Sequence, residues 1–201
     1  MSFASLTHYL VLHWSWIEFA GWTTTFAGIW LTTRRILWCW PITLAADILY
    51  LVVFYRARLL SDALLQIFFI VFTLYGWWNW WRGKRKEGEV RVAPLAILNA
   101  LIAVAAGVAG TFILGAVAKR LNASLPYLDA SLASFSLVAS WWQARRNIAN
   151  WWLWIVVDIL YIGEYIYKDL WLTAILYTAL VGLAVFGLHE WNRAPRETAP
   201  A

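Results

Sequence analysis

The chain has 201 residues, of which 63% are hydrophobic and 13% charged, and its formal net charge is +5. A water-soluble domain carries about 25% charged residues, so this composition excludes an ordinary soluble protein. The single cysteine, Cys39, excludes an internal disulfide and a thiolate metal cluster. The basic residues lie at the ends of apolar segments, which indicates topology signals rather than a nucleic-acid-binding surface.

Long uncharged segments predict membrane-spanning helices. Residues 63–81, 92–118 and 170–189 contain 19, 27 and 20 consecutive uncharged residues. Each segment is long enough to cross a hydrocarbon core of about 30 Å as a helix. The pattern predicts an all-α polytopic membrane protein with seven transmembrane helices, over 14–32, 36–56, 60–81, 92–118, 125–143, 147–167 and 170–191.

The chain contains an internal repeat. Residues 30–82 recur without a gap as residues 141–193, at an offset of 111. Paired copies of a membrane unit are how many transporters build a central binding site. The identical pairs include Trp40 with Trp151, Asp47 with Asp158, Gly76 with Gly187, and Trp80 with Trp191.

The number of helices predicts how the copies are oriented. Each copy has three spans, so the second would enter the membrane upside down without the additional Ala- and Gly-rich span 92–118. A 3+1+3 arrangement therefore predicts two parallel three-helix repeats, related by an axis along the membrane normal. The corresponding parts are 1–83 (N-terminal extension and first repeat), 84–120 (basic loop and linker helix), 121–193 (second repeat) and 194–201 (a disordered cytoplasmic tail).

The distribution of Lys and Arg predicts the topology. Eleven of them follow the first, third, fifth and seventh predicted helices, and five lie on the other side. Because cytoplasmic loops are enriched in basic residues, we expect an outside N-terminus and a cytoplasmic C-terminus.

Two aspartates are candidates for a central site. Asp47 and Asp158 occupy equivalent positions, each twelve residues after an arginine of the basic side. Twelve helical residues span about 18 Å, which places both carboxyl groups near the middle of the membrane. A carboxyl group there costs several kcal/mol unless it faces a cavity or a partner. We expect the two to face each other across the centre; the alternative is that they only tie neighbouring helices together.

Aromatic and polar side chains share a helix face with these aspartates. An indole-lined cavity with a carboxylate suits a flat, positively charged ring. For Gln66 and Tyr177, at matched positions, a structural role is the alternative. The candidate substrate-binding residues are Trp151, Trp154, Asp158, Asp47, Trp40, Tyr161, Gln66, Tyr177 and Asn147.

The sequence gives little indication of metal binding, cofactor binding or catalysis. His189 has no second histidine nearby, so we expect no metal site, and no motif indicates a cofactor or a nucleophile. Glu164 and Lys168 have the spacing of an intrahelical ion pair. A transporter rather than an enzyme is therefore expected. An intramembrane enzyme using Asp47 and Asp158 remains the alternative from another class, and it requires the two acids in close contact.

Two segments, 74–86 and 150–191, resemble the PnuC family of bacterial vitamin transporters. The family is marked by a Trp-x-x-Trp element followed by Asn or Asp, and by a Tyr-Gly-Trp-rich end of the third core helix. The matching residues are Trp151, Trp154 and Asp158 for the first motif, and Tyr75, Gly76, Trp77 and Trp78 for the second.

The resemblance implies a fold like that of the SWEET sugar transporters and uptake of nicotinamide riboside by facilitated diffusion across the bacterial inner membrane. It implies that phosphorylation by a cytoplasmic kinase traps the substrate, and that Trp151, Trp154 and Asp158 contact it. Several relatives are trimers, so a homo-oligomer is also implied. The acid at position 158 suits the pyridinium of nicotinamide riboside and the thiazolium of thiamine, and thiamine is the alternative substrate.

Overall fold

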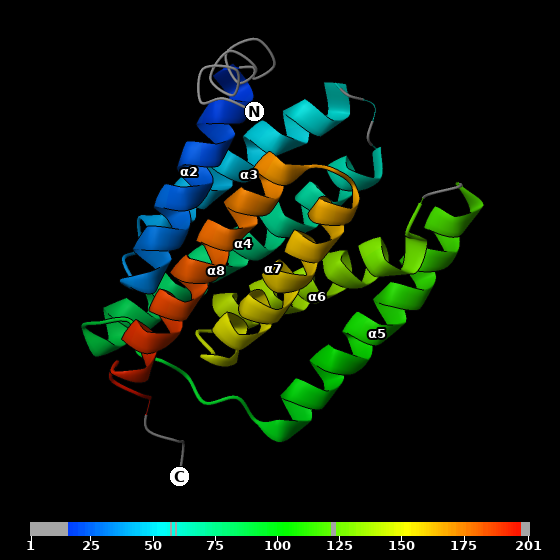
Figure 1. Ribbon diagram of the computed structural model, residues 1–201. Helices are drawn as coiled ribbons and strands as arrows, with labels where there is room; N and C mark the ends of the chain where they lie inside the picture. The colour runs from blue at the N-terminus through cyan, green and yellow to red at the C-terminus, as the bar shows by residue number, and fades with distance from the viewer. Residues whose placement is uncertain (1–15, 57, 59, 122–123, 198–201) are drawn as a thin grey trace.

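The computed structural model describes residues 16–56, 58, 60–121 and 124–197. In this part of the chain the regular secondary structure consists of α-helices and two isolated β-bridges, joined by turns and an irregular linker (Figure 1). The seven predicted helices are confirmed. The main differences are that α4 continues six residues beyond its predicted end and α5 begins five residues later. The helices are α2 (Trp16–Thr33), α3 (Cys39–Arg56), α4 (Leu60–Glu87), α5 (Ile97–Arg120), α6 (Pro126–Ala144), α7 (Ala149–Tyr167) and α8 (Trp171–Asn192).

The helices have the character of a multi-pass membrane protein. Four of them, α3, α4, α5 and α8, are long and apolar enough to cross a membrane by length and composition. The exposed side chains of α5 are mostly aliphatic or aromatic, as on a lipid-facing helix. By contrast, α6 carries buried Ser134 and Ser136 and has more buried residues than any other described helix. Polar groups are therefore concentrated in the interior.

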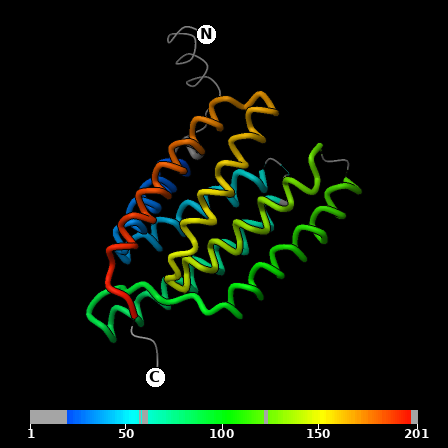
Figure 2. Tube along the Cα trace, turned by 60° about the horizontal axis from the view of Figure 1, so that its bottom comes forward, coloured from blue at the N-terminus to red at the C-terminus, as the bar shows by residue number. Residues whose placement is uncertain are grey.

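Six helices form a closed ring. Proceeding around it, α2 packs against α3, α3 against α4, α4 against α6, α6 against α7, α7 against α8, and α8 against α2. We call α2–α4 the first segment and α6–α8 the second. Among the described helices α5 packs only against α6, and it stands outside the ring in both views (Figures 1 and 2). Gly107 and Gly115 allow this close approach, because they face the rings of Phe135 and Tyr127.

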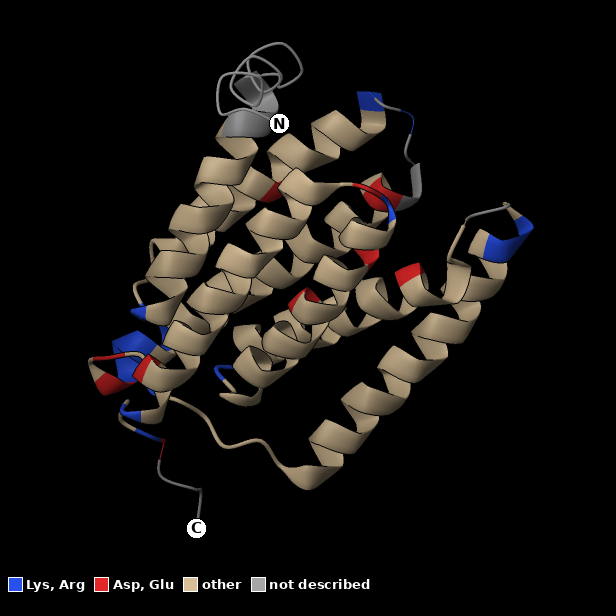
Figure 3. Cartoon of the chain, viewed as in Figure 1, with Lys and Arg blue, Asp and Glu red and all other residues tan. Residues whose placement is uncertain are grey.

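Basic residues gather at one end of the ring, where α2, α4 and α8 finish (Figure 3). We call this the basic end. At the opposite end, Lys168 pairs with Glu164, which confirms the predicted intrahelical ion pair. The Lys168 Nζ atom also lies 3.2 Å from Asp129 Oδ1 on α6. The two ends therefore differ in charge, and the long apolar helices run between them.

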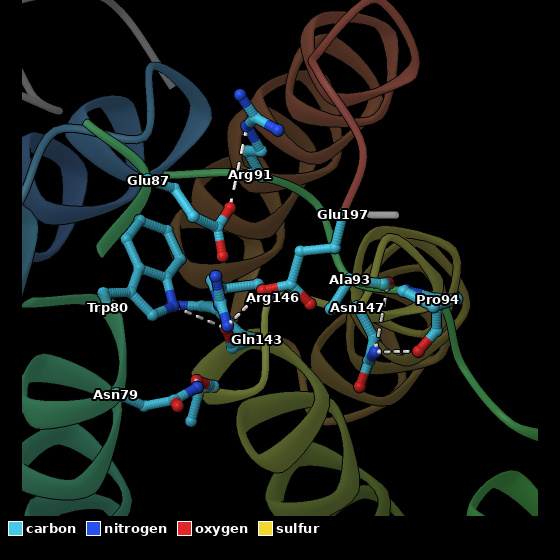
Figure 4. A network of polar contacts seen from close by, with 11 residues as sticks. Asn79, Trp80, Glu87, Arg91, Ala93, Pro94, Gln143, Arg146, Asn147 and Glu197 are labelled. Atoms are coloured by element: carbon cyan, nitrogen blue, oxygen red, sulfur yellow. Dashed lines mark hydrogen bonds and ion pairs between the residues drawn. The ribbon is translucent and has the colours of Figure 1, made fainter. Parts of the chain in front are cut away.

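The tail after α8 is ordered as far as Glu197, so the predicted disorder is wrong for residues 194–197. Val92 N donates to Pro195 O at 3.0 Å, and Glu197 N donates to Val92 O at 2.9 Å. The Glu197 carboxylate pairs with Arg146 Nη2 at 2.6 Å (Figure 4). The tail is held in place because its backbone forms hydrogen bonds with the backbone of the linker before α5. We call residues 90–94 and 194–197 the basic-end strap; residues 198–201 lie outside the described part.

The repeat in the sequence is accompanied by a repeat in the backbone. Arg35 and Arg146 end matched turns with φ of 56° and 62°, and Arg58 and Asp169 do so with φ of 59° and 58°. Positive φ is uncommon for residues other than glycine, so two matched pairs indicate the same turn geometry in both copies. Gly76 and Gly187 are likewise packed directly against the matched rings of Trp40 and Trp151.

Gly187 should be intolerant of a methyl group. A Cβ atom there would lie 2.6 Å from the Trp151 ring, whereas one at Gly182 on the same helix would meet nothing within 4 Å. Overpacking costs about 1–3 kcal/mol, and Gly→Ala in a helix otherwise gains about 0.5–1 kcal/mol. We expect Gly187→Ala to lower the thermal unfolding midpoint in detergent and Gly182→Ala to leave it unchanged or raise it. Equal midpoints for the two variants would contradict this packing.

Candidate functional site

Four tryptophans form a continuous layer near the basic end. Trp40, Trp80, Trp151 and Trp191 are each at most 3% exposed. The Trp40 and Trp80 rings meet edge-on with centroids 5.1 Å apart, and the matched Trp151 and Trp191 rings do so at 5.5 Å. Trp80 and Trp191 join the two pairs at 5.7 Å. This tryptophan layer therefore brings together Trp40 and Trp151, two of the predicted site residues.

Two indole N–H groups of the layer connect the segments. Trp80 Nε1, in the first segment, donates to Gln143 O in the second at 3.1 Å. Trp191 Nε1, in the second segment, donates to Thr32 O in the first at 3.1 Å. Thr32 and Gln143 are themselves matched in the repeat. The same bond is thus made twice, once in each direction across the ring.

The other two indoles of the layer have unused donors. The Nε1 atoms of Trp40 and Trp151 are buried and have no hydrogen-bond partner among the described residues. A buried donor without a partner loses its bonds to water and costs about 1–3 kcal/mol. Such donors are available to a bound molecule with an acceptor group.

Beyond the layer, the predicted face of α7 continues away from the basic end. Trp154 lies about one turn beyond Trp151, and its Nε1 donates to Gln143 Oε1 at 3.3 Å. Asp158 follows one turn further and is only 4% exposed. The residues from Trp151 to Asp158 thus place an aromatic face and then a carboxyl group along the inside of one helix.

The two matched aspartates differ in their hydrogen bonding. Asp47 Oδ2 accepts a bond from Thr73 Oγ1 at 2.8 Å. The residue matched to Thr73 in the second segment is Ala184, which has no hydroxyl group. Asp158 accordingly makes no hydrogen bond or ion pair with any residue of the described chain. A buried carboxyl group without a partner is costly.

A tyrosine cluster adjoins Asp158. The Tyr177 ring on α8 lies 4.9 Å from that of Tyr161 and 5.0 Å from that of Tyr165. Asp158 lies one turn before Tyr161 on the same face of α7. The structure therefore brings three predicted residues, Asp158, Tyr161 and Tyr177, to one place on the α7–α8 pair.

Two predicted residues are placed differently. Asn147 lies in the turn before α7 rather than on the helix, and its Nδ2 donates to Ala93 O and Pro94 O at 3.2 and 3.0 Å. Its amide group thus holds the basic-end strap. Gln66 is half-buried on α4 and makes no hydrogen bond or ion pair within the described part of the chain.

Sequence reasoning missed the residues that distinguish the copies. It relied on positions at which the copies agree, and so it overlooked Thr73 and Ala184. The sequence did contain a sign of this difference: the matched positions hold a polar residue in one copy and an apolar residue in the other, although the acid is the same in both copies. The indole bonds of Trp80 and Trp191 were also missed, because their carbonyl partners carry no side-chain signal.

The ring of helices and its buried carboxyl and aromatic groups define a multi-pass membrane protein with the interior of a small-solute transporter. The family model described as nicotinamide mononucleotide transporter matches residues 15–193. The chain belongs to this family, and the predicted membership of the PnuC family is confirmed.

Individual relatives agree with this assignment. The riboflavin/roseoflavin transporter RibM of Streptomyces davaonensis is 28% identical, over 94% of this chain and 90% of its own length. The nicotinamide riboside transporter PnuC of Escherichia coli is 24% identical, over 91% of this chain and 87% of its own. The crystal structure of a vitamin B3 transporter PnuC superposes with a TM-score of 0.70 and 25% identity, covering 93% of this chain and 85% of that one.

The indole bond of Trp191 should contribute to stability independently of its ring. Trp191→Phe retains an aromatic ring but removes the donor to Thr32 O, at an expected cost of about 1–3 kcal/mol. We expect a lower thermal unfolding midpoint in detergent. Trp78→Phe is the matched control, because Trp78 lies on the surface and is 50% exposed. A midpoint for Trp191→Phe as high as that of the control would show that the cross-segment bond is dispensable.

Proposed function

We propose that the protein is a facilitator for the uptake of a flat, cationic vitamin, with nicotinamide riboside as the substrate. The observation that carries the proposal is the buried carboxyl group of Asp158, which lacks a partner in the described chain and lies beside aromatic rings. A pyridinium ring carries a positive charge that can pair with this carboxylate. The same ring presents a flat surface that can stack on the aromatic side chains. The names of the relatives support transport of a B-type vitamin.

The proposed architecture is the 3+1+3 arrangement of two parallel three-helix repeats, as in the SWEET transporters, with α5 as the linker. Three features support it: the matched turns, the matched indole bonds, and the ring in which α4–α6 and α8–α2 are equivalent contacts. The basic end is proposed to face the cytoplasm of a bacterial inner membrane, since Lys and Arg are enriched on that side. The N-terminus is then outside.

In the proposed mechanism, substrate enters from the end opposite the basic end. Its ring stacks on Trp154 and Trp151, and its positive charge lies near Asp158. The tryptophan layer closes the path toward the cytoplasm. Opening this path requires Trp80 and Trp191 to separate, which breaks the two cross-segment indole bonds. Transport is then a shift in population between a form with these bonds and one without them.

The charge of Asp158 distinguishes among vitamin substrates. Nicotinamide riboside and thiamine both carry a permanently cationic ring, whereas the ring system of riboflavin is neutral. A buried carboxylate gains most from a cation, so the cationic vitamins are preferred over the substrate named for RibM. Thiamine is the second candidate substrate, because its cationic ring can pair with Asp158 in the same way.

Replacing Asp158 should abolish saturable uptake. Asp158→Ala removes both the charge and the acceptor oxygens that a cationic ring requires, while Asp47→Ala alters a carboxyl group that Thr73 already satisfies. We expect Asp158→Ala to reduce uptake of labelled nicotinamide riboside into proteoliposomes by about 100-fold or more, the equivalent of about 2.7 kcal/mol, and Asp47→Ala to reduce it less. Size-exclusion profiles establish that both variants are folded. Normal uptake by Asp158→Ala would refute the role of this residue.

Transport should be passive. In proteoliposomes without ATP or an ion gradient, we expect internal nicotinamide riboside to stop at the external concentration. Enclosing a nicotinamide riboside kinase with ATP should increase the total label taken up, because the phosphorylated product does not return. Unlabelled thiamine and riboflavin, added as competitors, identify the preferred vitamin. Accumulation above the external concentration in the absence of the kinase would exclude facilitated diffusion.

A further inference from the structure

A cavity of about 200 Å³ lies at the basic end, outside the candidate transport site. Its walls come from α4, the end of α6 with the following turn, the basic-end strap, and Leu95 and Asn99 at the beginning of α5. Several of the lining residues appear in Figure 4. A water molecule occupies about 30 Å³ of liquid, so the cavity has room for a small organic molecule. The charged and polar residues of its lining, together with one tryptophan, include Asn79, Trp141, Arg145, Arg146, Asn147 and Glu197.

The matched contact on the other side of the ring shows that this cavity has an excess of positive charge. There, Arg34 lies over the Trp30 ring and pairs with Glu190 at 3.3 Å. In the cavity, Arg145 lies over Trp141 in the same way, at 5.4 Å from the ring centroid.

The residue matched to Glu190 in the cavity is the neutral Asn79. Arg145 therefore makes no ion pair with any residue of the described chain. This copy of the contact therefore has the arginine but a neutral amide in place of the carboxylate.

The second arginine of the cavity already holds an oxyanion. Arg146 is 9% exposed, and its Nη2 lies 2.6 Å from Glu197 Oε1. Its Nε and Nη1 atoms are buried and have no hydrogen-bond partner among the described residues. The guanidinium group matches carboxylate and phosphate geometry equally well. Glu197, near the end of the chain, thus occupies a position that another oxyanion fits.

Two asparagines supply oriented acceptors. Asn79 Nδ2 donates to Ala144 O at 2.9 Å, and Asn147 Nδ2 donates to Ala93 O and Pro94 O. These bonds fix which atom of each amide is the oxygen. Neither Oδ1 atom accepts a hydrogen bond from the described chain. The cavity therefore combines cationic donors with neutral acceptors, which is the complement of a phosphate joined to hydroxyl groups.

We propose that this cavity binds a small phosphate ester that carries hydroxyl groups, of the sugar phosphate type. The phosphate pairs with Arg145 and displaces the Glu197 carboxylate from Arg146, and the hydroxyl groups donate to Asn79 and Asn147. This chemistry has two sources, a soluble sugar phosphate or the glycerol phosphate headgroup of a membrane lipid. Because the walls come from both segments, an occupant couples binding at this cavity to the relative position of α4 and α6.

The experiment measures binding of ribose 5-phosphate to the purified full-length protein in detergent by calorimetry, with ribose as the control. Arg145→Gln should weaken binding by about ten-fold or more, the loss of one charge-assisted contact. Glu197→Gln should tighten binding, because it neutralises the anion that competes for Arg146. Arg193→Gln is the matched control, an exposed arginine of the same end that does not line the cavity.

A second arm identifies the source. In nanodiscs, loss of ribose 5-phosphate binding with phosphatidylglycerol but not with phosphatidylcholine assigns the cavity to the lipid headgroup; retained binding in both assigns it to the soluble ester. Asp158→Ala should leave this binding intact, so the result is independent of the transport proposal. Equal binding of ribose and ribose 5-phosphate, or an Arg145→Gln variant that binds as tightly as the Arg193→Gln control, would overturn the inference.

Discussion

The packing of the two segments at the basic end depends on one interaction made twice, the indole N–H bond that each segment gives to a carbonyl of the other. Trp80 and Trp191 are fully buried, so these bonds form away from water, where their loss is most costly. Edge-on contacts attach each of them to a second indole, and glycines on α4 and α8 admit those second rings close to the backbone. Shape and hydrogen bonding thus both hold the segments together at the basic end.

The repeat is most informative where its copies differ. Both segments keep the central acid, but only the first supplies a threonine to satisfy it. Both keep an arginine stacked on a tryptophan, but only the α2–α8 contact supplies a carboxylate to neutralise it. The two segments therefore differ at two places, where the carboxyl group of Asp158 and the guanidinium group of Arg145 have no ion-pair partner among the described residues. They lie at different depths of the molecule.

Much of the fold could be predicted, because apolar length and the offset of 111 residues are visible in the sequence. The number of helices, the basic end and the face from Trp151 to Asp158 all followed from spacing. The strap around Val92 and Glu197 did not, since backbone pairing between an irregular linker and a tail leaves no periodic pattern. Asn147 continued the spacing of the α7 face but lies in the turn before the helix, because its side chain bonds to the linker at Ala93 and Pro94, a contact that periodicity does not reveal.

The strap has a mechanical consequence. Beyond Val90 the linker is bonded to the α6–α7 turn and to the tail, and α5 rests on α6, so all of this moves with the second segment. The covalent connection back to the first segment is then only the few residues after Glu87. Among them is Gly88, whose φ of +77° is a conformation that other residues rarely adopt. If one segment swings against the other, as the proposed mechanism requires, the change in backbone angles falls on these two or three residues, and the helices on either side need not bend.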